Sequence, residues 1–370
     1  MKHELAFRLI GKLLNWSDAD FAKEFRELQL MIDHKYDSYQ GFQPATRFHV
    51  ALLNWLSQFP TDYQRQVAYR FVKDRLVFVS QREVHHLVSL LMPIADHIAR
   101  RRVAAELGIP LYVTHLDPLA TRRLDILRRR TLYVGLSDGA RIDVFRRYNE
   151  GRVSNEQVVA FSEISDDKWN DLQAELWKSL ARFGPSKERP WFEAICLVDD
   201  FSGSGSSLIR YDEESKRWKG KIDKFYKANA ERIGESLSTD CVIHVHHHLA
   251  SEQARRQIEA DIACFAADNP KFKYTTSFSY VLPPDIVIGD GYPDPDLVAL
   301  LRRCYDPGIE DEHTRRDIWF GYKQCGLPLV LEHNTPNNSV ALLWAESKAG
   351  ATPHQMKPLF ARRKRHSSNG

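Results

Sequence analysis

The segment from residue 195 to residue 208, ICLVDDFSGSGSSL, constrains the fold of this chain more than any other. Its first residues are apolar and end in two carboxylates, Asp199 and Asp200, after which glycine and serine dominate. This order is expected where a buried parallel strand presents functional groups at its carboxyl end. The segment therefore predicts an α/β fold with a ligand site at the end of this strand.

The two carboxylates and the small residues suggest a cradle for ribose 5-phosphate. Asp199 and Asp200 can accept hydrogen bonds from vicinal sugar hydroxyls. The loop 203–207 can turn backbone N–H groups and serine hydroxyls toward a phosphate at the start of a following helix. The alternative is a simple Gly/Ser turn in which one acid caps the next helix. We favour the cradle because two adjacent acids are costly to bury unless a ligand uses them.

Two other nucleotide-binding motifs fit the segment poorly. A dinucleotide fingerprint needs a third glycine and an acid about twenty residues downstream, whereas here Gly203 and Gly205 follow the acids. A mononucleotide P-loop needs Gly-Lys-Ser/Thr, which the segment lacks.

The segment resembles the phosphoribosyl pyrophosphate (PRPP) loop of type I phosphoribosyltransferases: an apolar strand, two acids, three residues, then Thr/Ser-Gly-x-Thr/Ser. The form DDFSGSG is also similar to a divergent branch, the phosphoribosyltransferase-like effectors of bacterial conflict (anti-phage) systems. The resemblance implies that Asp199 and Asp200 are the catalytic carboxylates, which hold the ribose hydroxyls, and that the loop binds PRPP or a nucleotide. The loop residues assigned to this ligand are Phe201, Ser202, Gly203, Ser204, Gly205, Ser206 and Ser207.

In this family an early strand, loop and helix supply the pyrophosphate-binding loop, and residues 132–148 fit that order. Arg141 would offer a planar fork for phosphate. The alternative is a hairpin, because Asp138-Gly139 is a strong turn signal and residues 141–145 would return as a strand. The residues assigned to the pyrophosphate loop are Ser137, Asp138, Gly139 and Arg141. A mobile lid is expected at 149–165, with Asn155, Glu156 and Gln157 as its candidate residues.

The function that this resemblance implies is Mg²⁺-assisted pentosyl transfer at ribose C1. Mg²⁺ and Arg141 would neutralise the leaving phosphates, while carboxylates would favour the developing positive charge on the ring. No metal site built from protein ligands is predicted. The alternative is a catalytically inactive module that senses PRPP or a nucleotide and signals to a protein partner through the N-terminal helices. A third interpretation is an effector that attacks a cellular nucleotide and is restrained until infection.

Hydrophobic periodicity predicts three regions along the chain. These are a helical N-terminal domain over 1–108, an α/β domain with a parallel sheet over 109–350, and a basic tail over 351–370 that is expected to be disordered from residue 362 onward. The resemblance implies that the α/β domain is phosphoribosyltransferase-like. Short apolar runs predict strands at 111–113 and 132–136. Near 208–222 an inserted hairpin takes the place of the uninterrupted helix that the family usually has.

In this family a hood over the sheet recognises the base, and the resemblance implies that the C-terminal region supplies it. Residues 327–344 predict two strands joined by a polar loop, and a plain Asn/Pro turn is the alternative. The residues that would contact a base are His333, Asn334, Asn337, Asn338 and Trp344.

The predicted strand 241–249 carries His244, His246 and His248 on one face. A metal site there is disfavoured because neither carboxylates nor cysteines lie in register with them. His247 and His248, at the carboxyl end of the strand, are candidates for pocket residues.

Charge and cysteine content set the remaining limits. The chain holds 52 Lys and Arg against 49 Asp and Glu, which argues against a dedicated nucleic-acid coat. Residues 100–147 hold eleven Arg against five acids, an excess that either attracts polyphosphate or nucleic acid or forms a solvated helix face. Five scattered cysteines, with no long apolar stretch and no signal pattern, favour a soluble protein of the reducing cytoplasm without a membrane partner.

Overall fold

The computed structural model describes residues 3–160, 163–184, 189–310, 316–348 and 354–362. The chain forms two compact units, one made of Met1–Glu83 with Pro283–Gly370 and the other of Val84–Leu282. We call them the terminal unit and the central unit, after their positions along the chain. The central unit is inserted in sequence between the two halves of the terminal unit.

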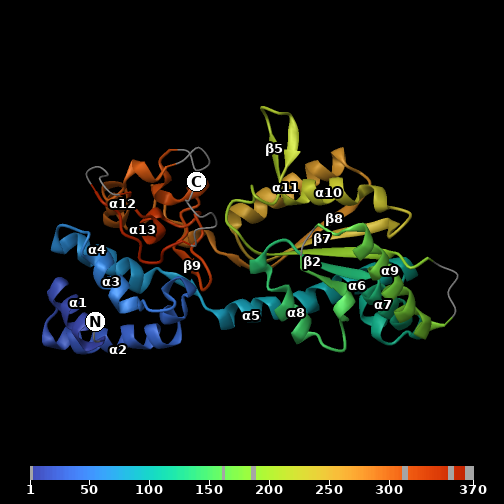
Figure 1. Ribbon diagram of the computed structural model, residues 1–370, viewed down its shortest axis with the longest axis horizontal. Coiled ribbons are helices and arrows are strands. Elements are labelled where there is room, and N and C mark those ends of the chain that lie inside the picture. The colour runs from blue at the N-terminus through green and yellow to red at the C-terminus, as the bar shows by residue number, and fades with distance from the viewer. Residues whose placement is uncertain (1–2, 161–162, 185–188, 311–315, 349–353, 363–370) are drawn as a thin grey trace. The chain divides into compact units, whose positions relative to one another are not determined.

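The central unit is built on a five-stranded parallel sheet with the strand order β3-β2-β4-β7-β8 (Figure 1). The apolar run before Asp199 forms the middle of β4, the central strand. A strand that is covered on both faces reads as a continuous apolar run, which is why the sequence signal is so clear. The strands are β2 (Thr131–Gly135), β3 (Val158–Val159), β4 (Phe192–Ser202), β7 (Leu237–Ser251) and β8 (Lys273–Leu282).

Helices cover both faces of this sheet. On one face, Trp169, Phe225 and Phe265 share a buried core with strand residues such as Ile195 and Ile243. These aromatic side chains come from α9 (Asp166–Leu180), α10 (Lys221–Asn229) and α11 (Glu252–Asp268). The other face is covered by α6 (Leu91–Leu107) and α8 (Ile142–Tyr148), with α7 (Pro118–Arg129) packed on α6.

The terminal unit joins the two ends of the chain around one aromatic core. Trp55 Nε1 donates a 2.8 Å hydrogen bond to the Leu342 carbonyl oxygen, and Phe360 packs against Tyr36 and Phe48. Strand β1 (Val77–Val79) pairs in parallel with β9 (Leu329–Leu331). The helices are α1 (His3–Leu13), α2 (Asp18–His34), α3 (Phe48–Leu56), α4 (Asp62–Asp74), α12 (Pro295–Arg303) and α13 (Ala341–Trp344), while α5 (Gln81–Ser89) spans the boundary at Glu83.

The parallel α/β fold class is confirmed, but the predicted domain limits do not coincide with the two units. Residues 84–108 belong to the central unit, where the Leu87 carbonyl oxygen accepts a 2.8 Å hydrogen bond from Ser279 Oγ of β8. Residues 283–350 belong to the terminal unit. Hydrophobic periodicity detects helices without showing which core they join, and this explains the difference.

The predicted tail also needs correction in part. Met356, Leu359 and Phe360 are buried in the core of the terminal unit, so this stretch is an ordered part of the fold. The remainder of the predicted tail, 351–353 and 363–370, lies outside the described residues.

Two predicted strands are wrong, and the inserted hairpin is present. Residues 111–113 lie in a 3₁₀ helix (Leu111–His115), and the second strand of the expected hood is helix α13. Short apolar runs do not distinguish a strand from a helical turn. The hairpin consists of β5 (Arg210–Asp212) paired antiparallel with β6 (Arg217–Lys219). Among the helices of the described residues, none has the length and apolar character needed to cross a membrane.

Candidate functional site

The parallel register brings several predicted site residues to one edge of the sheet. Gly135 of β2 lies opposite Val198 of β4, and Asp199 lies opposite His247 of β7. The segments that follow these positions leave the sheet at its carboxyl edge. Open α/β sheets bind their ligands at this edge.

Asp199 is the most buried acid of this edge, with 3% of its surface exposed. Its Oδ1 accepts a 2.5 Å hydrogen bond from Ser137 Oγ, and its Oδ2 forms an ion pair with the Lys221 ammonium. Burial raises the pKa of Asp199 to about 6, with the charge of Asp200 acting in the same direction and Lys221 and Ser137 opposing it. The carboxylate is therefore mostly ionised at neutral pH and titrates just below it.

Asp200 lies against the loop that follows β2. Ser137 Oγ is 3.3 Å from Asp200 Oδ1, so one hydroxyl reaches both aspartates. A Cβ at Gly139 would lie 2.1 Å from Asp200 Oδ2, so a side chain there would displace this carboxylate. The sequence motifs 137–141 and 199–200 are therefore in direct contact.

The loop after β2 leads into a helix. Asp138–Ala140 forms a 3₁₀ turn, and α8 begins at Ile142. The alternative in which residues 141–145 return as a hairpin strand is therefore wrong. Arg141 occupies the N-cap position of α8 with a left-handed φ of 49°. Its assignment to pyrophosphate stays a prediction.

The Gly/Ser loop after β4 is held in shape by its own side chains. The Gly205 N–H donates to Ser202 Oγ at 3.2 Å, and the Ser204 and Ser206 hydroxyls lie 2.8 Å apart. Ser251, the N-cap of α11, donates from Oγ to the Gly203 carbonyl oxygen at 2.6 Å. The loop is thus fixed to the end of β7.

Three backbone donors of this loop are unused. Within the part of the chain that the structure describes, the N–H groups of Ser204, Ser206 and Ser207 make no hydrogen bond. Successive free N–H groups in a turn form a concave anion-binding site. The loop can therefore accept a phosphate next to the two aspartates.

The inserted hairpin leaves this loop joined to a helix by hydrogen bonds. The chain leaves the loop through β5 and returns through β6 to Gly220, extending away from the sheet (Figure 1). The Lys221 N–H then donates to the Ser207 carbonyl oxygen at 3.3 Å, and the Ile222 N–H donates to Leu208 at 3.1 Å. Helix α10 therefore starts against the end of the Gly/Ser loop, and its first residue reaches Asp199.

Lys221 is the site residue that sequence analysis missed. It is separated from Asp199 by 22 positions and by the hairpin, and a lone lysine at a helix start belongs to no motif. The available signal was Gly220, which marks the end of the hairpin and the start of the next helix.

The histidine run of β7 is structural over most of its length. His244 bonds to Thr275 and Ser277, and His246 bonds to Ser277 and Ser279, at distances from 2.7 to 3.1 Å. Burial lowers the pKa of His244 to about 4. The described residues contain no group of three potential metal ligands.

His247 and His248 lie nearest to the site. His248 Nε2 is 2.9 Å from the Ala140 carbonyl oxygen, so this side chain supports the loop after β2 instead of facing an open pocket. His247 stacks on Phe278, and burial lowers its pKa to about 3. Both imidazoles are therefore neutral at pH 7.

The candidate lid residues lie at the opposite edge of the sheet. Asn155–Gln157 forms a 3₁₀ turn just before the amino end of β3. Gln157 is buried and donates to the carbonyl oxygens of Arg128 and Thr131. This turn is held in place by those bonds and does not cover the Asp199 edge. Residues 161 and 162 of the expected lid lie outside the described residues.

The residues proposed to recognise a base belong to the terminal unit. Asn338 is buried and donates to the Tyr322 carbonyl oxygen at 3.2 Å, and Trp344 Nε1 donates to the Ser339 carbonyl oxygen at 2.9 Å. Both side chains therefore have structural bonds within that unit. Their role in base recognition stays a prediction.

Comparison with known proteins adds one finding to this geometry. Residues 52–362, most of the chain, match the family model described as PRTase-CE. No curated protein and no solved structure matches the chain.

Proposed function

The chain belongs to the PRTase-CE family of phosphoribosyltransferase-like proteins, and we propose that it binds PRPP or a ribose 5-phosphate nucleotide and transfers the pentosyl group. One observation carries this proposal. The ionisable pair Asp199 and Asp200 stands beside the free N–H groups of Ser204, Ser206 and Ser207 at the carboxyl edge of a parallel sheet. This arrangement offers acceptors for sugar hydroxyls and donors for a phosphate within one site.

The proposed reaction is a displacement at ribose C1. The bond from C1 to the pyrophosphate oxygen breaks, the electron pair leaves with pyrophosphate, and a lone pair of the acceptor forms the new bond to C1. The acceptor then gives up its proton to solvent or buffer. Asp199 and Asp200 hold the ribose hydroxyls, and their negative charge favours the positive charge that develops on the ring. The Gly/Ser loop fixes the 5′-phosphate.

Mg²⁺ fits this donor set when the substrate brings its own oxygens. Mg²⁺ is usually bound by one or two carboxylates together with substrate phosphates. Asp200 and Oδ2 of Asp199 would be its protein ligands. The ion would neutralise charge on the leaving pyrophosphate. Lys221 would have to turn away from Asp199 to admit a cation there, since both compete for the same oxygen.

A second candidate function is a sensor that binds PRPP or a nucleotide without consuming it and regulates a protein partner. The observation that favours it is the state of Asp199, whose two oxygens are both engaged by the chain's own Ser137 and Lys221. A ligand that displaces Lys221, the first residue of α10, from Asp199 would link its binding to the start of that helix.

Turnover separates the two candidates. We expect mass spectrometry of the protein with Mg²⁺, PRPP and a panel of bases and nucleotides to show a new pentosylated product. Asp199→Asn with Asp200→Asn should lower its rate on the order of 100-fold, whereas the surface variant Asp143→Asn should keep it. PRPP binding without any product would favour the sensor. Absence of both binding and turnover would contradict both candidates.

We extend the proposal to a defence role because of the DDFSGSG form of the loop. Such an effector would be toxic when expressed without restraint, and the Asp199→Asn/Asp200→Asn variant should relieve the toxicity. Growth of the expressing bacterium is the measurement. Toxicity that the double variant retains would contradict a role for this site.

A further inference from the structure

A cavity lined mostly by polar and charged side chains lies at the amino edge of the same sheet, the edge opposite to Asp199. It has a volume of about 390 Å³, and its lining includes Phe192, the first residue of β4, and Glu156, in the turn before β3. Arg129 enters from the last turn of α7, and Lys178 and Arg182 come from the end of α9 and the turn after it. The cavity is within the size range of small-molecule sites.

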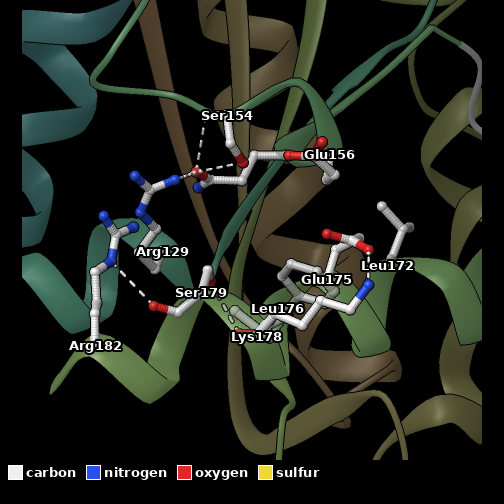
Figure 2. A pocket seen from close by; sticks show the side chains of 11 residues that line it. Arg129, Ser154, Glu156, Leu172, Glu175, Leu176, Lys178, Ser179 and Arg182 are labelled. Atoms are coloured by element: carbon white, nitrogen blue, oxygen red, sulfur yellow. Dashed lines mark hydrogen bonds and ion pairs between the residues drawn. The ribbon is translucent and has the colours of Figure 1, made fainter. Parts of the chain in front are cut away.

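Two guanidinium groups stand next to each other on one side of this cavity (Figure 2). Arg129 donates to Gln157 Oε1 at 3.1 Å, and Arg182 donates from Nε to the Ser179 carbonyl oxygen at 3.0 Å. Among the described residues, neither arginine forms an ion pair with a carboxylate. Burial lowers the pKa of Arg129, and the charge of Arg182 acts in the same direction, while Glu156 and Asp125 oppose both.

The neighbouring arginines are arranged differently. Arg102, Arg123 and Arg130 all converge on the buried Glu193 carboxylate, at distances of 3.0, 2.6 and 3.1 Å. Glu193 directly follows Phe192 of the cavity wall. Three arginines beside the cavity are therefore paired with a carboxylate, whereas Arg129 and Arg182 within it form no ion pair with any described residue. Unpaired, adjacent guanidinium groups are the arrangement that binds phosphate bidentately.

We propose that this cavity is a second ligand site, separate from the Asp199 site, and that it binds a phosphorylated small molecule. The phosphate lies between Arg129 and Arg182. On the other side of the cavity, Glu175 forms a 2.6 Å ion pair with Lys178, and Glu156 lines the wall (Figure 2). These carboxylates can accept hydrogen bonds from hydroxyl or amino groups of the ligand. The ligand that fits both the arginines and these carboxylates is a sugar phosphate or a nucleotide.

The test uses inorganic pyrophosphate as the probe and arginine modification as the readout. Phenylglyoxal reacts with accessible guanidinium groups, and mass spectrometry of peptides gives the rate for each arginine of the intact chain. We expect pyrophosphate to slow the modification of Arg129 and Arg182 at least fivefold. Arg101, an exposed arginine of α6 outside the cavity, should react at an unchanged rate. The modification rate is measured for each arginine separately. Pyrophosphate bound at the Gly/Ser loop therefore does not mimic protection of Arg129 and Arg182.

A variant tests whether the two arginines act together. In Arg182→Gln the bond from Arg129 to Gln157 is kept, yet protection of Arg129 should fall at least threefold, whereas Arg101→Gln should leave it unchanged. The proposal is overturned if Arg129 is not protected in the native protein. Equal protection of Arg101 would indicate non-specific attraction and also overturns the proposal. Unchanged protection of Arg129 in Arg182→Gln overturns it as well.

Discussion

At the scale of single residues, Asp199 and Lys221 set the charge of the candidate active site. Burial raises the pKa of Asp199 to about 6, and Lys221 keeps that pKa from rising further. An ionised carboxylate accepts hydrogen bonds on both oxygens, whereas a protonated one also carries a donor. Ligand binding through Asp199 is therefore linked to the pH at which this group ionises.

We expect PRPP binding to strengthen as the pH rises through about 6, because Asp199 loses its proton there. In Lys221→Met the opposing positive charge is gone, so the midpoint of this dependence should move to higher pH. Calorimetric affinities between about pH 5 and pH 8 measure both effects. Asp199→Asn removes this group, so the pH dependence that remains, from the PRPP phosphates and the other titrating groups, provides the baseline.

Lys224→Met is the matched control for this shift. Lys224 lies on the same helix, one turn later, and does not pair with Asp199. The same midpoint in Lys221→Met and the native protein would show that Lys221 does not tune Asp199. A shift toward lower pH would contradict the sign of the interaction.

At the scale of elements, the contact between the Gly/Ser loop and α10 depends on one glycine. Gly220 has a φ of 123°, and a Cβ there would lie 2.5 Å from the Leu208 carbonyl oxygen. Both the backbone conformation and the space exclude a side chain. We expect Gly220→Ala to lower the free energy of unfolding by about 2 kcal/mol and to weaken PRPP binding, because Lys221 and the loop lose their register.

Gly234→Ala is the control that separates the strain of a positive φ from the steric contact with Leu208. Gly234 also has a positive φ, of 85°, but a Cβ there would meet no atom within 4 Å. Urea unfolding should show a smaller loss for Gly234→Ala, with PRPP affinity preserved. Equal losses in the two variants would mean that the Leu208 contact contributes nothing.

The elements around the site also show what the sequence can predict. Strand β4 and its two aspartates were predictable because a buried central strand reads as an apolar run and because the motif is local. The role of Lys221 was not predictable, because the β5–β6 hairpin separates it from Asp199 in the sequence. For the loop after β2, the sequence leaves two interpretations open, a pyrophosphate-binding loop and a hairpin turn. The structure excludes the hairpin because α8 follows the turn. The approach of Gly139 to Asp200 is a contact between distant segments, which a local motif does not reveal.

At the scale of the whole molecule, the terminal unit is made from both ends of the chain. Helical periodicity predicts a domain that ends near residue 108. It cannot show that β1 pairs with β9 from the other end of the chain. Trp55, Tyr39 and Phe48 are buried, and each contacts a residue beyond position 330. The C-terminal segment therefore covers part of the apolar surface of the N-terminal helices.

Fragments test this arrangement. Residues 84–282 hold the complete parallel sheet and its helices, so we expect them to unfold cooperatively in urea as an isolated fragment. Residues 1–108, the domain suggested by periodicity, should lack cooperative unfolding because their aromatic core has lost its C-terminal half. Mixing residues 1–83 with residues 283–370 should restore a cooperative transition by circular dichroism, and Trp55→Ala should abolish it. A cooperatively folded 1–108 fragment would contradict the shared core, because α1–α4 would then need no partner from the other end of the chain.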